Sequence, residues 1–230
     1  MHVPDGFLDA PTSLATGAVA LAGVGICLRK ARAELDERTV PLAGLVAAFV
    51  FATQMFNFPV GAGTSGHLLG GALAAMLVGP WLGALCVSVV LLVQAVLFAD
   101  GGLTALGTNI VLMAFVTTAV AWGIISLSAR VLPRTAASAV GTAFVAAVVS
   151  VPVSALAFTG LYSIGGTTDV PLGALAGAMV GVHLLIGLGE AAITALAVSS
   201  VLAVRPDLVA GARHLLPQDG DLAMSPRSVS

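Results

Sequence analysis

Residue 2 is one of four histidines in this chain of 230 residues, and its place beside the amino terminus gives it metal chemistry. The amine of Met1, the amide nitrogen of His2 and the His2 imidazole close two fused chelate rings on one metal ion. Nitrogen-rich, flat coordination suits Ni(II) and Cu(II), and imidazole also binds Co(II). Because the amine and the amide must lose protons, such binding weakens in acid. A frayed surface histidine is the alternative, and both interpretations stay open at this point.

The stretch VPDG that follows the histidine predicts a turn. Pro4 at its second position and Gly6 at its fourth suit a type I turn. A turn here folds the first residues back toward the rest of the molecule.

His67 adds a fourth nitrogen if it lies on the same side of the molecule as Met1. It stands in the stretch GAGTSGHLLGG, whose glycines permit an irregular backbone. At membrane depth such a backbone is tolerated only where protein surrounds it or where it faces a cavity. A helix-cap or loop histidine is the alternative for this residue.

His183 and Glu190 lie seven residues apart in GVHLLIGLGEAAIT and therefore share one helix face. An ionisable residue within a membrane span is functional by default and needs a partner. Glu190 is a candidate for orienting a ligand, for bonding to the N-terminal segment or for carrying a proton. A polar pair that only locks helix packing is the alternative.

Five more polar residues are candidates for groups that orient the imidazoles around a metal. They are Asn57, Ser65, Gln94, Asp100 and Asn109. Asp100 is equally a candidate cap for the helix that follows it.

The elements that must position these residues are membrane helices. Of the residues, 58% are hydrophobic and only 9% are charged, whereas a soluble domain carries about 25% charged residues. Abundant small residues and few aromatics favour helices over a barrel. Seven apolar segments are predicted, at 10–28, 41–57, 67–79, 81–98, 104–128, 136–161 and 172–204. The sequence thus predicts an all-α integral membrane protein with one domain, 1–204, and a polar, flexible cytoplasmic tail, 205–230.

The basic residues predict which side each linker occupies, because cytoplasmic linkers carry the excess of Lys and Arg. All nine follow the first segment, the fifth segment or the last: Arg29, Lys30, Arg32, Arg38, Arg130, Arg134, Arg205, Arg213 and Arg227. Seven spans with the amino terminus outside place all of them in the cytoplasm. Asp5 and Asp9 precede the first segment, the reverse of a signal peptide, so we expect a retained helix.

Composition and motifs exclude several function classes. A net charge of −2 gives no electrostatic basis for binding nucleic acid. The single lysine, Lys30, follows Arg29 rather than glycine, so the chain has no phosphate-binding loop for ATP. Cys27 and Cys86 fall in apolar segments without metal-type spacing and are expected to be small buried hydrophobes.

Four separated stretches together resemble the CbiM/NikM family. These are MHVPDGFLD, the stretch 56–83 around TSGHLLGG, the turn FADGGLTALGTNIVLM (98–113) and HLLIGLGEAAIT (183–194). Members of this family are substrate-binding S components of energy-coupling factor transporters for cobalt and nickel. The resemblance covers most of residues 1–204. The stretch VGAG (60–63) departs from the proline-containing linker of the relatives, which affects the shape of the loop and leaves the ligands in place.

The resemblance implies a seven-helix bundle whose amino terminus is outside and tucked into the bundle. It implies a transported Co(II) or Ni(II) ion bound by the Met1 amine, the His2 amide and imidazole, and the His67 imidazole, with no cofactor and no enzymatic activity. It also implies partners in a prokaryotic plasma membrane: a transmembrane coupling (T) subunit, two ABC ATPases and a small accessory membrane protein. Two other functions remain as alternatives. One is an intramembrane enzyme that uses His183 and Glu190, and the other is a metal-independent channel or structural membrane subunit.

Overall fold

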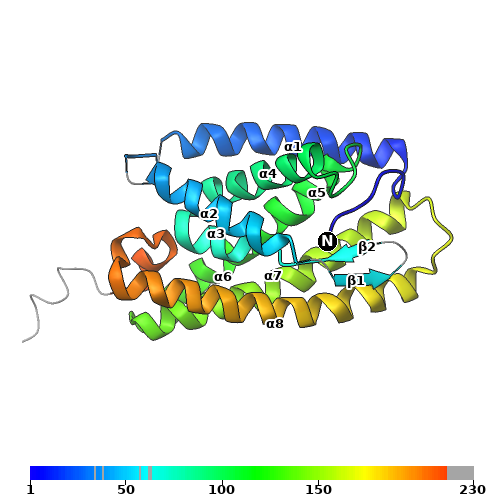
Figure 1. The fold of residues 1–230 in the computed structure, drawn as a ribbon. Helices are drawn as coiled ribbons and strands as arrows, with labels where there is room; N and C mark the ends of the chain where they lie inside the picture. Colours follow the sequence, from blue (N-terminus) through cyan, green and yellow to red (C-terminus); the bar gives the residue numbers. More distant parts are fainter. Residues whose placement is uncertain (34, 38, 57, 62–63, 217–230) are drawn as a thin grey trace, which may run out of the picture.

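The structure is a computed structural model that describes residues 1–33, 35–37, 39–56, 58–61 and 64–216, with the side chains of the hairpin residues 58–61 and 64–65 left out (Figure 1). Within these residues the chain is a helical bundle with one short hairpin. The helices are α1 (Ala10–Ala31), α2 (Thr39–Gln54), α3 (Gly71–Val78), α4 (Pro80–Leu97), α5 (Leu106–Asn109), η1 (Ile110–Val116), α6 (Thr117–Val131), α7 (Ala136–Gly165) and α8 (Leu172–Val204). Two 3-10 helices, η2 (Pro206–Leu208) and η3 (Ala210–His214), follow α8.

The predicted apolar segments correspond to helices one for one, because α5, η1 and α6 run on as one rod from Leu106 to Val131. Five helices in the described chain are long and apolar enough to cross a bilayer: α1, α4, the rod, α7 and α8. The all-helical, multi-pass membrane class is therefore confirmed. The number of crossings and the side on which each terminus lies stay predictions.

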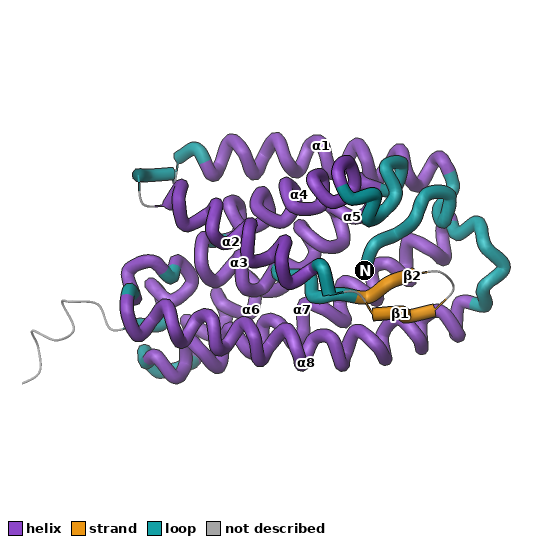
Figure 2. The backbone as a smooth tube through the Cα atoms, viewed as in Figure 1, coloured by secondary structure: helices purple, strands orange, loops and turns teal. Residues whose placement is uncertain are grey.

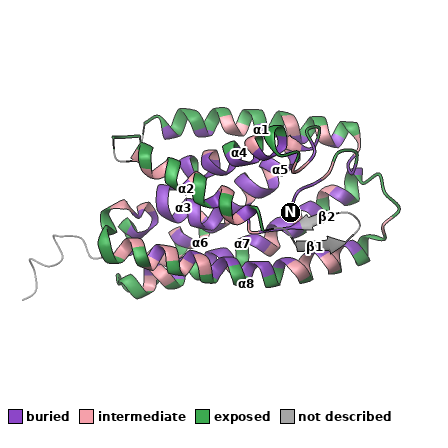
Figure 3. Cartoon of the chain, viewed as in Figure 1, coloured by how far each residue is buried: buried purple, intermediate pink, exposed green. Residues whose placement is uncertain are grey.

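The third segment differs from a full span. Helix α3 has eight residues, all of them buried, which at 1.5 Å per residue is about 12 Å against a hydrocarbon core of about 30 Å. Gly79, at φ +83°, ends it, and Pro80 begins α4 directly afterwards. Figure 3 shows α3 buried along its length between more exposed outer helices.

The outward faces of the long helices are apolar. Leu14 and Leu21 of α1 are 75% and 79% exposed, and Leu185 of α8 is 70% exposed. A water-soluble surface does not carry large aliphatic side chains at this density, whereas lipid tails cover them without cost. These faces are therefore lipid-facing.

The loops that carry the candidate residues gather at one end of the bundle (Figure 2). The N-terminal segment, the hairpin and the loop at 98–105 lie at the end where α7 connects to α8. Arg29 and Lys30 close α1, Arg130 lies in the last turn of α6, and Arg205 follows α8. These basic positions lie at the opposite end of the bundle (Figure 1), as the positive-inside pattern requires.

The linker between α2 and α3 folds into an antiparallel hairpin, which the sequence analysis did not predict. Strands β1 (Phe58–Gly61) and β2 (Thr64–Gly66) pair Phe58 with Gly66 and Pro59 with Ser65. His67 follows β2 directly, so the hairpin places this histidine at the same end of the bundle as the N-terminal segment.

The segment after α8 is folded as far as Leu216, where a polar tail from Arg205 was predicted. Val209, Ala212 and Leu215 are fully buried. A Cβ on Gly211 would lie 2.6 Å from the Met76 sulfur, so η3 packs directly against α3.

Candidate metal centre

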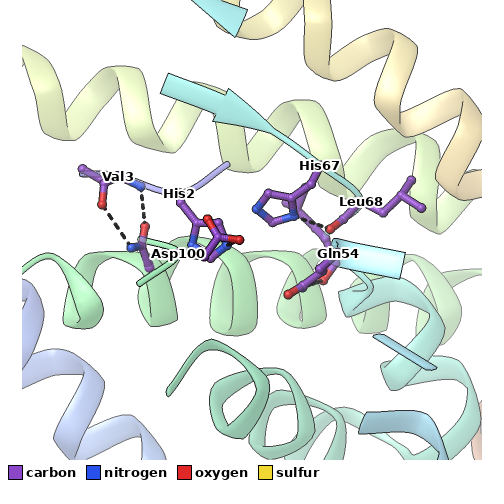
Figure 4. A network of polar contacts seen from close by, with 8 residues as sticks. His2, Val3, Gln54, His67, Leu68 and Asp100 are labelled. Atoms are coloured by element: carbon purple, nitrogen blue, oxygen red, sulfur yellow. Dashed lines mark hydrogen bonds and ion pairs between the residues drawn. The ribbon is translucent and has the colours of Figure 1, made fainter. Parts of the chain in front are cut away.

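The first three residues are inserted into the bundle. Met1, His2 and Val3 are 1%, 5% and 1% exposed. The Asn109 side chain holds this segment at Val3: its Oδ1 accepts the Val3 N–H at 2.8 Å, and its Nδ2 donates to the Val3 carbonyl at 3.2 Å. Gly102 N–H donates to the same carbonyl at 3.1 Å. The N-terminal segment is thus held through both the N–H and the carbonyl of Val3 (Figure 4).

The turn that follows is displaced by one residue from the predicted one. Phe7 N–H donates to the Pro4 carbonyl at 3.4 Å, so the turn spans 4–7 instead of 3–6. Gly6 occupies its third position with φ +74°, a conformation that favours glycine and that type II turns require there. The prediction of a type I turn with Pro4 second is therefore wrong, while the reversal of direction is confirmed.

The turn is anchored to the α7–α8 connection. Leu8 forms a bridge with Gly166, and Asp9 N–H donates to the Gly165 carbonyl at 2.7 Å. The Asp9 side chain then accepts the Thr12 N–H at 2.9 Å, which caps α1. The N-terminal segment is consequently tied to the bundle at both of its ends.

The His2 and His67 rings lie next to each other at the end of this segment (Figure 4). Their ring centroids are 4.5 Å apart, with 33° between the planes. His67 is fully buried, and its Nδ1 lies 2.6 Å from the Leu68 carbonyl. A carbonyl accepts only, so Nδ1 carries the proton and the lone pair of Nε2 is free. No hydrogen-bond partner for His67 Nε2 or for either His2 ring nitrogen exists among the described residues.

Asp100 and Gly101 shape the surroundings of the His2 ring. The Asp100 carboxylate lies 3.6 Å from His2 Nε2, which leaves Nδ1, the nitrogen nearer the backbone, for chelation together with the amine and the amide. A Cβ on Gly101 would come within 2.7 Å of that Nδ1. Gly101 also has φ +86°, so both space and backbone conformation require glycine there.

Burial keeps the donor groups uncharged. Desolvation lowers the pKa of the Met1 amine from 8.0 to about 4, with Asp100 and Glu190 opposing the shift. Desolvation and the nearby amine lower the pKa of His2 to about 3, and the same two causes hold the pKa of His67 well below 6.5. Near neutral pH the lone pairs of the amine and both imidazoles are therefore available to a metal without prior loss of a proton.

His183 and Glu190 share the buried face of α8, as predicted, but their hydrogen bonds lead to different partners. His183 Nδ1 donates to the Met179 carbonyl at 2.7 Å, and its Nε2 has no hydrogen-bond partner in the described structure. Glu190 accepts the Leu69 N–H at 2.6 Å and the Gly70 N–H at 3.0 Å. It therefore bonds to the backbone beside His67.

The remaining candidates divide into three groups. Asn109 and Asp100 contact the N-terminal segment, as described above. Gln94 is fully buried, and its main-chain carbonyl accepts the Phe98 N–H and the Asp100 N–H, each at 3.1 Å. Neither polar atom of its side chain has a hydrogen-bond partner among the described residues. Asn57 and the side chain of Ser65 lie outside the described residues.

Gln54 and Gly101 are site residues that the sequence analysis missed. Gln54 is fully buried near the end of α2, and its Nε2 donates to the Leu69 carbonyl at 2.7 Å. The signal was present in the sequence, since Gln54 is an amide within a mainly apolar segment. The contact of Gly101 with His2 has no counterpart in the sequence pattern.

The arrangement offers a nitrogen-only coordination set. No group of three or more His, Cys, Asp or Glu side chains is placed to hold a metal in the described part of the chain. The nitrogens that lie together here are the amine of Met1, the amide nitrogen of His2 and the two imidazoles. A cavity of about 350 Å³, lined by His2, Pro4, Asp5 and residues 99–102, opens over His2.

Comparisons with known proteins identify metal-transport relatives. A family profile, CbiM, described as "Cobalt uptake substrate-specific transmembrane region", matches residues 2–208. The cobalt transport protein CbiM of Sorangium cellulosum is 36% identical over 217 residues, which cover 91% of this chain and 94% of the relative. The fused nickel transport protein NikMN of Rhodobacter capsulatus is 42% identical over 130 residues, which cover 56% of this chain and 38% of that protein.

A solved structure has the same fold. The crystal structure of a truncated transition metal transporter superimposes with a TM-score of 0.79 at 32% sequence identity. The match covers 88% of this chain and 99% of that one.

Proposed function

Since this chain belongs to the CbiM family of cobalt-uptake substrate-specific transmembrane proteins, we propose that it is the substrate-binding membrane subunit of an energy-coupling factor transporter. Its substrate in this proposal is external Co(II) or Ni(II). The donor nitrogens are the Met1 amine, the His2 amide and Nδ1, and His67 Nε2.

The observation that carries the proposal is the buried pair of imidazoles beside the amino terminus. Two rings whose centroids are 4.5 Å apart and a buried amine with a lowered pKa are costly in a core unless a partner satisfies their lone pairs. A divalent metal ion supplies that partner for all of them at once, and imidazole with amine nitrogen suits Ni(II) and Co(II).

The surroundings support entry of a hydrated cation. The cavity over His2 is lined by Asp5 and Asp100, whose carboxylates attract a divalent ion. The ion then exchanges water for nitrogen at His2, which lines the cavity. Because the Met1 amine and the two imidazoles are neutral near pH 7, they bind the ion without first losing a proton. Only the His2 amide gives up a proton.

Partner proteins belong to the same proposal. A chain with no phosphate-binding loop requires separate ABC ATPases, and energy coupling requires a transmembrane coupling subunit in a prokaryotic plasma membrane. A small accessory membrane protein completes the expected assembly. The support for these partners is the family alone.

An enzyme that uses His183 and Glu190 is less well supported. The hydrogen bonds of both side chains go to backbone groups, and the relatives are named as transport proteins. A transport subunit accounts for both observations.

The test is metal analysis of purified protein that begins at Met1 with a free amine. We expect about one Ni(II) or Co(II) per chain, because one amine and one His2 supply one chelate. The matched control carries the same affinity tag at the carboxyl end and two additional residues before Met1, which convert the amine into an amide. If the extended protein binds either metal as tightly as the native one, the N-terminal chelate is wrong. Calorimetry with both metals on the native protein then decides which ion is the substrate.

A further inference from the structure

We infer that Glu190 of α8 is the positioning residue that keeps the His67 imidazole in the tautomer and orientation a metal requires. The inference rests on the proposed function, because it concerns the same metal centre. Glu190 acts on His67 through residues 68–70, which directly follow His67 in the chain.

The Glu190 carboxylate is buried and accepts hydrogen bonds from the backbone. Glu190 is 3% exposed and accepts two consecutive backbone N–H groups, from Leu69 at 2.6 Å and Gly70 at 3.0 Å. These donors lie at the N-terminal end of α3, which begins at Gly71. The partial positive charge of a helix N-terminus stabilises an anion at this place. The carboxylate thus has fixed partners although water is excluded.

Helix α2 also clamps this short segment, residues 69 and 70. Gln54 Nε2 donates to the Leu69 carbonyl at 2.7 Å. Gly70, at φ +78°, packs so closely on Val50 that a Cβ there would lie 2.8 Å from the Val50 methyl groups. With Glu190 on one side and α2 on the other, the peptide groups of residues 69 and 70 have little freedom to rotate.

The fixed orientation of the peptide groups also orients His67. The Leu68 carbonyl belongs to the peptide group whose N–H is that of Leu69, the group that Glu190 binds. Because a peptide group is planar, fixing the N–H also fixes the direction of the carbonyl. His67 Nδ1 donates to that carbonyl at 2.6 Å. The proton stays on Nδ1 as a result, and Nε2 keeps its lone pair for the metal.

The test separates positioning of His67 from simple support of the fold. Outer partners of a ligating histidine contribute about 10–100-fold to metal affinity. We therefore expect Glu190→Gln to weaken Ni(II) binding by about 10–100-fold, because a neutral amide accepts only one of the two N–H groups. Thr194→Val is the matched control, since Thr194 is buried one turn further along α8 and its hydroxyl has no hydrogen-bond partner in the described structure.

A double-mutant cycle with His67→Ala gives the decisive comparison. If Glu190 acts through His67, then Glu190→Gln changes Ni(II) affinity by no more than about twofold in the His67→Ala background. An equal loss of affinity in both backgrounds, or no loss in either, would overturn the inference. Should Glu190→Gln fail to fold, Glu190→Asp retains the charge but shortens the reach, and the same cycle applies to it.

A metal-free measurement distinguishes this inference from the proposed function. In nanodiscs, the imidazole ¹⁵N shifts of His67 should report the Nδ1–H tautomer in the native protein and a mixture of tautomers in Glu190→Gln. If the native protein shows that tautomer but binds no metal, the proposed function fails and the role of Glu190 in orienting His67 stands. An unchanged His67 spectrum in Glu190→Gln refutes that role whatever the metal result.

Discussion

Asn109 shows how a single side chain holds the N-terminal segment in place. It makes two hydrogen bonds to Val3, one residue beyond His2, so it fixes the backbone from which the amine and amide nitrogens project. Asn109→Leu has a similar volume but neither hydrogen bond. We expect it to weaken Ni(II) binding by about 10–100-fold with little change in helix content.

The control for this variant is its neighbour, Thr108→Val. The Thr108 hydroxyl is hydrogen-bonded to the Thr16 hydroxyl at 2.7 Å, whereas the side-chain bonds to Val3 come from Asn109. Calorimetric titration of both variants with Ni(II) should therefore separate them. Equal affinities in the two variants would contradict a role for Asn109 at the metal centre.

The buried amine and imidazole at Met1 and His2 predict how the metal-free protein responds to acid. Their pKa values are lowered on folding, from 8.0 to about 4 and from 6.5 to about 3. Below the unfolded values the unfolded chain binds protons that the folded chain does not, so stability falls as pH falls. We expect the melting temperature of the metal-free protein in detergent to decrease steadily from pH 8 to pH 5.

Acetylation of Met1 provides the control for this pH dependence, because it removes the titrating amine. The acetylated protein should show a flatter profile between pH 8 and pH 6.5. Asp5 and Asp9 do not interfere, since hydrogen bonds from threonine side chains and backbone groups lower their pKa values below 3.8. A melting temperature that rises toward acid would contradict the assignment of buried, neutral donors.

At the scale of elements, the approach of α1 to α5 brings Asn109 within reach of Val3. A Cβ on Gly107 would lie 2.4 Å from the Cα of Gly17, whereas a Cβ on Gly17 itself meets nothing within 4 Å. Gly107→Ala must push the two backbones apart, which costs about 1–3 kcal/mol. We expect a lower melting temperature and weaker metal binding for Gly107→Ala, measured by thermal unfolding and calorimetry.

Gly17→Ala is the natural comparison because it adds the same methyl group to the other partner of the same contact. Alanine in place of glycine within a helix gains about 1 kcal/mol in helix propensity, so this variant should match or exceed the native melting temperature. If both alanine variants shift the melting temperature alike, the close approach of α1 and α5 does not determine the stability of the fold.

The sequence predicted some of these elements well and others poorly, for physical reasons. A long apolar segment in a bilayer forms a helix, because its backbone polar groups must be satisfied within the segment. The positions of α7 and α8 therefore followed from hydropathy alone. The hairpin before His67 was missed, because TSGH and its glycines carry no strand pattern. Glu190 was identified as functional from its place in a span, but its partners are backbone N–H groups some 120 residues away, which no local pattern reveals.

For the whole molecule, the candidate metal centre and the folded carboxyl segment lie at opposite ends of the same short helix. Helix α3 begins four residues after His67, and η3 packs on its other part through Gly211 against Met76. Deleting residues 205–230 exposes buried apolar surface on α3 and on the other neighbours of this segment. The free-energy cost is about 25 cal/mol for each Å² exposed. We expect this truncation to lower the melting temperature of the metal-free protein by several degrees.

Ending the chain after Leu216 supplies the matched control, because Val209, Ala212 and Leu215 are retained. This shorter truncation should keep both the native melting temperature and the native Ni(II) affinity. The longer truncation should lose Ni(II) affinity as well, since α3 is anchored through Gly70 to the clamp that positions His67. If it melts lower but binds Ni(II) as tightly as the native chain, then the two ends of α3 are energetically independent, and the carboxyl segment serves the fold alone.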